Sequence, residues 1–150
     1  MYEIDEKSNH ILQILTKNGR ISNIELAERV NMSPSACLRR VQDLERRGII
    51  TGYRAQLGRA EMGVGFIAYL GVGLSQHNRD AQQTFERAMS LAPEVVECHN
   101  TTGNIEYLLR VECADLKAYK AFHTETLGTV ANVAAITTYV ILDSPKDQRS

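Results

Sequence analysis

The sequence predicts an α+β protein of two small domains, a helical domain in the first third of the chain and a βαββαβ domain behind it. Apolar residues recur at helical spacing in the first part, after which strand-like and helical stretches alternate. The charge balance changes in the same region: residues 1–59 hold ten Lys and Arg against seven Asp and Glu, whereas the remainder holds seven against eleven. We therefore expect one domain over residues 1–60 and a second over residues 61–150.

The first two helices of the N-terminal domain are marked by their end signals. Asp5 is a suitable N-cap for the first helix, and the pair Asn18-Gly19 is a typical stop. Ser22 and Glu25 then form a capping box, in which each side chain satisfies a free backbone amide of the other residue. This box predicts a second, short helix directly after the first.

The third helix also carries strong end signals. Ser33 is placed as its N-cap, Pro34 stands at the first helical position, where its missing N–H costs nothing, and Gly48 is the stop. Only a tight break at residues 31–32 separates it from the second helix, and two short helices joined in this way predict a helix-turn-helix. Residues 49–54 have the composition of a strand or hairpin, which would give the winged form of that motif.

The second domain is predicted from alternating strand and helix signals. Its strands are rich in Val, Ile, Thr and Tyr, and its helices carry an apolar stripe. Strands are expected at residues 64–74, 95–99, 105–113 and 133–142, and helices at residues 78–92 and 115–127. The resulting order, βαββαβ, is that of the ferredoxin-like split βαβ motif.

The third helix has the residue pattern of a DNA-reading helix. A helix in the major groove needs short side chains near its N-terminus for close approach, followed by arginines that can fork onto guanine edges or phosphates. With Cys37, Val41 and Leu44 turned inward, its other face provides both. The residues expected to contact double-stranded DNA are Ser33, Ser35, Ala36, Arg39, Arg40, Gln42, Arg46, Arg47 and Arg54.

Two structural interpretations of these arginines stay open. Arginines on an exposed helix face often serve only to solvate it. Arg40 in particular could pair with Glu45 or Asp43 and brace the domain instead of contacting a base. The tight helix pair in which the arginines lie favours the DNA-binding interpretation.

Composition argues against several other classes of protein. The longest nearly apolar stretch, Val64–Leu74, is too short to span a bilayer, and the acidic start lacks the layout of a signal peptide. The three cysteines form no C-x-x-C pair and the four histidines are dispersed, so neither disulfides nor a metal site is expected. No nucleophile and base come with an orienting acid or an oxyanion motif. We therefore expect a cytoplasmic protein that is not an enzyme and has no cofactor.

Six stretches spread over both predicted domains form a set of motifs. They are Asn18–Ala27 (NGRISNIELA), Ser33–Val41 (SPSACLRRV), Leu44–Ile50 (LERRGII), Pro93–His99 (PEVVECH), Gly103–Leu109 (GNIEYLL) and Thr138–Val140 (TYV). In this order they resemble the leucine-responsive/asparagine-synthase regulator family (Lrp/AsnC), the feast/famine regulators. The resemblance covers nearly the whole chain.

The resemblance implies a winged helix-turn-helix head and a ferredoxin-like domain, called RAM for regulation of amino-acid metabolism. It implies that this second domain pairs chains into dimers, which often ring into tetramers of dimers. It further implies that a small amino acid binds between dimers and shifts assembly or DNA binding. The residues that would line this effector site are Thr102, Gly103, Asn104, Ile105, Glu106, Tyr107 and Val140.

The loop at residues 102–107 departs from the family pattern, which is commonly Gly-Asp-x-Asp-Tyr and here is Gly103-Asn104-Ile105-Glu106-Tyr107. A carboxylate in this loop would be expected to meet the ammonium group of an amino acid, with backbone N–H groups on its carboxylate. Glu106 still provides that charge from one methylene further out, so the size of the preferred ligand could differ. A loop that does not respond to amino acids, with a purely structural Gly-Asn turn, is the alternative.

Two functional hypotheses follow. The first is a sequence-specific DNA-binding transcriptional regulator, modulated by a small amino acid bound between dimers of the second domain. The second is an architectural DNA-binding protein that wraps DNA around an oligomer without a ligand. A response to free amino acids distinguishes the two.

Overall fold

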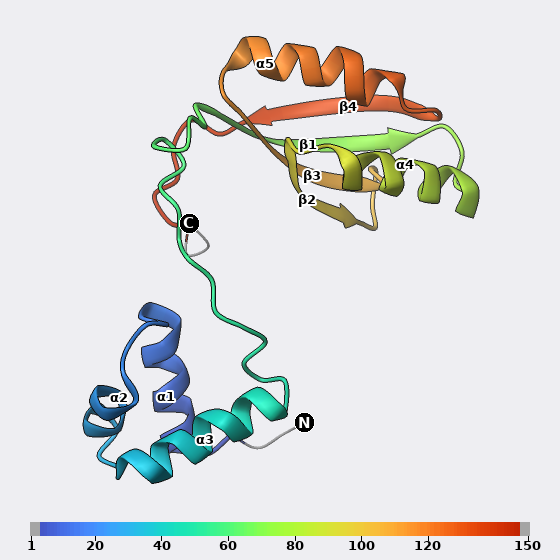
Figure 1. Ribbon diagram of the computed structural model, residues 1–150. Helices are drawn as coiled ribbons and strands as arrows, with labels where there is room; N and C mark the ends of the chain where they lie inside the picture. Colours follow the sequence, from blue (N-terminus) through green and yellow to red (C-terminus); the bar gives the residue numbers. More distant parts are fainter. Residues whose placement is uncertain (1–3, 148–150) are drawn as a thin grey trace. The chain divides into compact units, whose positions relative to one another are not determined.

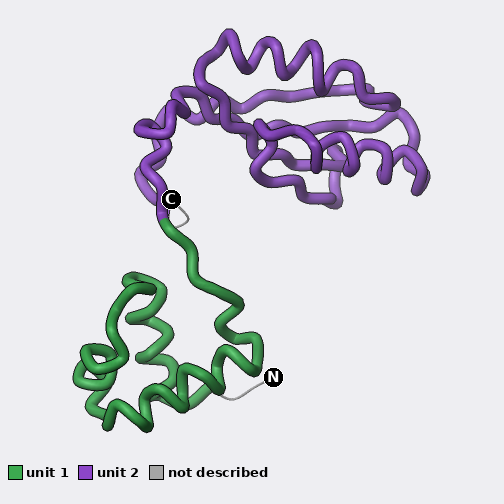
Figure 2. Tube along the Cα trace, in the orientation of Figure 1, with its two compact units in different colours: residues 1–55 green, residues 56–150 purple. Residues whose placement is uncertain are grey.

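The computed structural model describes residues 4–147 (Figure 1). The chain divides into two compact units, Met1–Ala55 and Gln56–Ser150 (Figure 2). This division falls a few residues before the boundary expected from the sequence. Each unit has a hydrophobic core of its own.

The first unit contains the three predicted helices, α1 (Glu6–Lys17), α2 (Asn23–Arg29) and α3 (Pro34–Arg46). Each of the predicted N-caps is confirmed, because Asp5, Ser22 and Ser33 accept a hydrogen bond from the backbone amide three residues further on. The helices bury one common core. Its fully buried members are Ile11, Leu26, Ala27, Val30, Cys37 and Leu44.

The turn between α2 and α3 is held by backbone and side-chain hydrogen bonds. Asn31 takes a positive φ of 52°, which asparagine tolerates better than most residues. The Met32 amide donates to the Ala27 carbonyl at 2.9 Å, and the Asn23 side-chain amide donates to the Pro34 carbonyl at 2.9 Å. The start of α2 is thereby tied to the start of α3, which fixes the angle of the helix pair.

The predicted strand or hairpin at residues 49–54 is wrong for this chain. Within the described part of the first unit there is no strand, and residues 51–58 have no regular secondary structure. Gly48 has a φ of +69°, and the amides of Ile49 and Ile50 both donate to the Leu44 carbonyl, at 2.9 and 3.1 Å. These donors are therefore spent on capping the C-terminus of α3, and the two isoleucines pack against the helical core.

The second unit has the predicted βαββαβ order. Its strands are β1 (Phe66–Leu74), β2 (Val95–Asn100), β3 (Tyr107–Cys113) and β4 (Val133–Val140), and its α-helices are α4 (Arg79–Leu91) and α5 (Leu116–Ala121). A π-helical turn (Phe122–Thr126) and a 3₁₀ turn (Leu127–Thr129) continue α5. All strand pairs are antiparallel and the sheet order is β2-β3-β1-β4, so the ferredoxin-like fold is confirmed.

The core of the second unit lies between the sheet and its helices. Alternate residues of the central strand β1 face the helices, and Phe66, Ala68, Leu70 and Val72 are buried there. From α4, Phe85 and Met89 complete this core, together with residues of α5 and the turns after it. The opposite face of the sheet is left without a covering helix, and a polar network crosses it.

This network is centred on Arg110 of β3, which is only 3% exposed. One guanidinium nitrogen lies 3.2 Å from Glu112 Oε1, and the other lies 3.3 Å from Asp147 Oδ2. Glu112 also forms an ion pair with Arg59, whose Nε donates to the same carboxylate oxygen at 2.6 Å. The network thus fastens the segment before β1 and the segment after β4 to the middle of the sheet.

Candidate DNA-binding helix and effector loop

The exposed face of α3 carries a single polar stripe. Ser35, Arg39, Gln42 and Arg46 follow one another at i, i+4, i+7 and i+11, and all four are exposed. Cys37 and Leu44 are buried on the opposite side of the helix. The stripe therefore presents a short side chain first and longer hydrogen-bonding side chains behind it, as reading a major groove requires.

Arg39 stands in the middle of this stripe. Among residues 4–147 it has no hydrogen-bond or ion-pair partner, and its side chain is exposed. A guanidinium in this state gives up no protein contact when it binds a base edge or a phosphate. Of the predicted DNA contacts on α3, Arg39 is the arginine whose geometry suits that role best.

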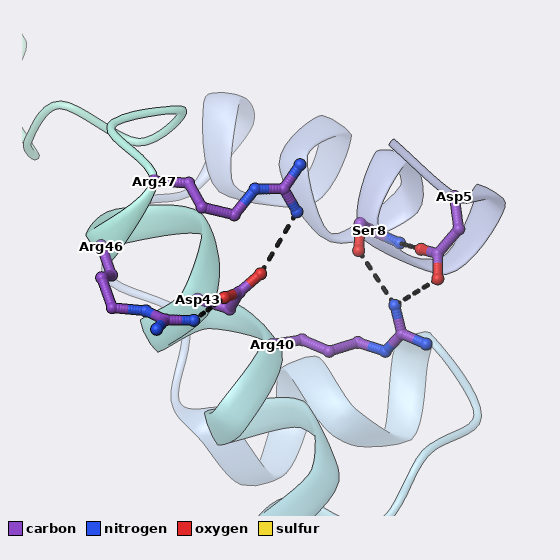
Figure 3. A network of polar contacts seen from close by, with 6 residues as sticks. All are labelled: Asp5, Ser8, Arg40, Asp43, Arg46 and Arg47. Atoms are coloured by element: carbon purple, nitrogen blue, oxygen red, sulfur yellow. Dashed lines mark hydrogen bonds and ion pairs between the residues drawn. The ribbon is translucent and has the colours of Figure 1, made fainter. Parts of the chain in front are cut away.

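Arg40 braces the first unit instead (Figure 3). One of its guanidinium nitrogens lies 2.5 Å from Asp5 Oδ2 and 3.0 Å from the Ser8 hydroxyl oxygen. The sequence left open a bracing role through Glu45 or Asp43, and the structure gives it different partners. Hydrogen bonds from Arg40 and from the Ser8 amide lower the pKa of Asp5 to about 2. Arg40 therefore links α3 to the first turn of α1.

Arg46 and Arg47 share one partner at the end of α3 (Figure 3). Both pair with Asp43, Arg46 one helical turn away and Arg47 with its guanidinium nitrogen 3.2 Å from Oδ2. The hydrogen bond from Arg46, followed by that from Arg47, lowers the pKa of Asp43. Arg46 is exposed and exposed pairs are weak, so this cation can exchange onto a phosphate, whereas Arg47 is half-buried.

The other predicted DNA contacts are placed less favourably. The Ser33 hydroxyl accepts the Ala36 amide at 3.3 Å and is spent on capping α3. Ala36 is half-buried, whereas Arg54 is exposed on the irregular segment after the helix. Ser33 and Ala36 therefore shape the start of the helix, and Arg54 lies outside it.

The Asp5–Arg40 link makes the first unit sensitive to acid. Ionised Asp5 contributes stability above its ordinary pKa of 3.8, and that contribution is lost as the pH falls toward about 2. Asp5→Asn should therefore unfold at a lower temperature than the wild type at neutral pH, and the difference should vanish near pH 2. Thermal unfolding of both chains over a pH series checks this. A difference in melting temperature that stays constant down to pH 2 would refute the link.

The loop between β2 and β3 is fastened at both of its ends. The Thr101 amide donates to the Glu106 carbonyl at 2.9 Å, the Thr101 hydroxyl donates to the Ile105 carbonyl at 3.0 Å, and the Glu106 amide donates to the Val72 carbonyl at 3.0 Å. Ile105 packs on Gly71, where a Cβ would come within 3.1 Å of the isoleucine side chain. The tip of the loop, residues 102–104, remains exposed.

Glu106 turns its carboxylate across the end of β1. Its Oε2 accepts the Leu74 amide at 2.7 Å, because the β1–β3 ladder ends at Val72 and leaves that amide without a strand partner. Its Oε1 lies 2.8 Å from Nδ1 of His77. His77 was absent from the predicted site, and no sequence signal joins two residues so far apart in the chain.

Tyr107 belongs to the core and not to the open side of the loop. It is 1% exposed, its hydroxyl donates to Glu86 at 2.7 Å, and its ring centroid lies 4.6 Å from that of Phe85. Burial, and then the hydrogen bond to Glu86, raise the pKa of Tyr107 to about 12. A side chain enclosed in this way does not reach a ligand from solvent, so we assign it to packing.

Val140 lies at the other end of the sheet. It pairs with Ala68 on β1, whereas Tyr107 at the loop pairs with Val72. Four residues along a strand span about 13 Å. Within one protomer, Val140 and the loop therefore do not form a single site.

Residues 4–147 also lack two features, a helix that could span a membrane and a group of metal-binding side chains. No helix over residues 4–147 is long and apolar enough to cross a membrane. In the same range, no group of three or more His, Cys, Asp and Glu side chains gathers where it could hold a metal ion. The close pairing of α2 with α3 and the exposed polar stripe of α3 are typical of a DNA-binding transcriptional regulator.

Comparison with known proteins identifies the family. The Lrp/AsnC ligand binding domain matches residues 67–150, and a winged helix-turn-helix DNA-binding domain matches residues 4–51. The chain belongs to the Lrp/AsnC family of transcriptional regulators. Because a ligand-binding domain matches the second unit, the alternative of an architectural DNA-binding protein without a ligand is not favoured.

Individual relatives resemble the chain over nearly its full length. The leucine-responsive regulatory protein of Escherichia coli is 36% identical over 144 residues, which cover 96% of this chain and 88% of that protein. A transcriptional regulator from Neisseria meningitidis, solved in complex with L-Met, is 35% identical, with a TM-score of 0.92 over 97% of this chain and 94% of that one. AsnC of E. coli is 26% identical, with a TM-score of 0.87 over 97% of each chain.

Proposed function

We propose that this regulator senses a small α-amino acid at the loop 101–106 and changes its DNA binding in response. The observation that carries the proposal is the Glu106 carboxylate, which a fastened loop holds at the end of β1, where Oε2 accepts the Leu74 amide and Oε1 lies beside the exposed His77 ring. An amino acid needs a carboxylate for its ammonium group and N–H donors for its own carboxylate. Glu106 supplies the first, and the backbone of Thr102, Gly103 and Asn104 supplies the second.

The names of two relatives support this class of effector. One relative is called leucine-responsive, and another was solved with L-Met. Leucine and methionine are both α-amino acids with an apolar side chain of moderate size, branched in leucine and unbranched in methionine. We take L-leucine and L-methionine as the first ligands to test, within a panel of all twenty amino acids.

We also propose that the effector binds between dimers of the second domain. The loop and Val140 are about 13 Å apart along the sheet, so one site containing both needs two chains. Binding at such a site shifts the balance between assemblies, because a ligand favours the state in which its site is complete. A regulator that acts on DNA in this way is expected in the cytoplasm.

For the DNA contact, we propose that α3 lies in the major groove. Ser35, Arg39 and Gln42 face the base edges, and Arg46, Arg47 and Arg54 reach flanking phosphates. Arg40 keeps its bracing contact with Asp5. Two such helices in a dimer read a near-palindromic site with half-sites one helical turn, or a multiple of it, apart.

Thermal melting with free amino acids tests the effector proposal. A ligand at about one hundred times its dissociation constant should stabilise the folded chain by roughly 2.7 kcal/mol. Glu106→Gln should abolish the shift, because the variant keeps the shape of the side chain and removes its charge. If none of the twenty amino acids raises the melting temperature, the sensing proposal fails and the DNA-binding function stands alone.

A further inference from the structure

The Glu106 carboxylate has partners within the chain itself, and its two oxygens differ in what holds them. Oε2 accepts the Leu74 amide at 2.7 Å, a bond that completes the end of the sheet. Among residues 4–147, the partner of Oε1 is the exposed side chain of His77, whose Nδ1 lies 2.8 Å away. The side chain of Glu106 is 20% exposed, and that of His77 is 73% exposed. Oε1 is therefore the oxygen that a ligand from solvent would reach.

The proton in this contact belongs to the imidazole. A nitrogen lone pair facing a carboxylate oxygen at 2.8 Å would be repelled, so Nδ1 carries the hydrogen. The imidazole presents an N–H to Oε1 in the same way that an ammonium group would. His77 and an amino-acid effector consequently compete for one acceptor.

The position of His77 allows it to leave this contact easily. The residue lies in the short connection after β1, directly before Asn78, whose side chain caps α4 by accepting the Ala81 amide at 2.9 Å. The backbone beside His77 is thereby fixed, while its ring lies in solvent and buries little surface. Displacing the ring costs only one polar contact of an exposed side chain, which is weak.

We propose that His77 is a gate on the effector site: its imidazole occupies the ammonium position on Glu106 in the ligand-free chain and is displaced when an α-amino acid binds. This inference rests on the proposed effector function. It makes His77 a positioning residue that acts on the ligand through Glu106. Because His77 competes with the ligand for Glu106, the wild-type chain binds its effector more weakly than the same site without the His77 imidazole would.

Calorimetric titration of the full-length chain with L-methionine and L-leucine tests the gate. His77→Ala should tighten binding by about two- to five-fold, the range that a weak polar contact of an exposed side chain corresponds to. The deaminated analogues, 4-(methylthio)butanoate and 4-methylpentanoate, lack the ammonium group, and their affinity should not change. Glu106→Gln should abolish binding of both amino acids, and adding His77→Ala should not restore it, because the two residues act on one contact.

The outcomes separate the gate from the function it rests on. Tighter binding of the amino acids alone supports the gate, as does binding that is detected only in His77→Ala. Unchanged or weaker binding in His77→Ala, with the wild type still binding, overturns the gate and leaves the effector function intact. An equal gain for the deaminated analogues also overturns it, since a general change in the loop would then be the cause. If neither chain binds L-methionine or L-leucine and none of the twenty amino acids raises the melting temperature, the effector function and the gate are overturned together.

Discussion

Replacing Arg110 with alanine should lower the free energy of unfolding of the second unit by about 3–5 kcal/mol. The guanidinium is almost fully buried and lies between Glu112 and Asp147. Both carboxylates are themselves largely covered, with 11% and 15% of the side chain exposed. Removing the guanidinium takes away the ion pair of Asp147 with Arg110, and of the two ion pairs of Glu112 it leaves the one with Arg59. It also opens a gap on the sheet face.

Chemical denaturation of the full chain at one fixed protein concentration measures this loss, with hydrogen exchange locating it in the strands of the second unit. Lys120→Ala is the matched control, because it removes an exposed cation from the same unit and should change stability by less than about 0.5 kcal/mol. If Arg110→Ala costs no more than this control, the network is not what fastens the two end segments to the sheet.

Replacing Arg39 with alanine should weaken binding to the specific DNA site by about 1–3 kcal/mol, or roughly five- to 150-fold. Arg39 is exposed on the polar stripe of α3, and it has no partner among residues 4–147 that would have to be given up. If it reads a base, the loss appears on the specific site and specificity relaxes at one position. If it holds a phosphate, all sequences lose affinity alike.

Binding of wild-type and variant chains to specific and unrelated duplexes, at one salt concentration, distinguishes these cases. Arg87→Ala is the control for charge, because Arg87 is an exposed arginine on α4 of the other unit. Equal effects of Arg39→Ala and Arg87→Ala on the specific duplex would contradict the assignment of α3 as the reading helix.

Arg40→Ala should instead lower the stability of the first unit, through loss of its contact with Asp5.

Local signals in the sequence were sufficient to predict most of the fold. Asp5, Ser22 and Ser33 act as N-caps because the capping hydrogen bond lies within three residues of the chain. The alternation of strand and helix patterns likewise predicts the βαββαβ order. The hairpin at residues 49–54 failed because a strand needs a partner strand, and here the isoleucine amides cap α3 instead.

The side-chain partners could not be predicted in the same way. The contact of Arg40 with Asp5 joins residues 35 positions apart, and that of His77 with Glu106 joins residues 29 positions apart. Both depend on how helices and strands pack, which no local pattern encodes. Tyr107 shows the same limit, because a residue of the family motif faces Phe85 and Glu86 in the core while its neighbour Glu106 faces the loop.

Selection of bound DNA from a random pool, with and without amino acids at physiological salt, tests most directly whether the chain is an amino-acid-responsive regulator. We expect enrichment of a near-palindromic site with half-sites one helical turn or a multiple of it apart, and we expect the occupancy of that site to change when an amino acid is added. Recovery of a pool with no enriched sequence, whether or not an amino acid is present, would contradict it.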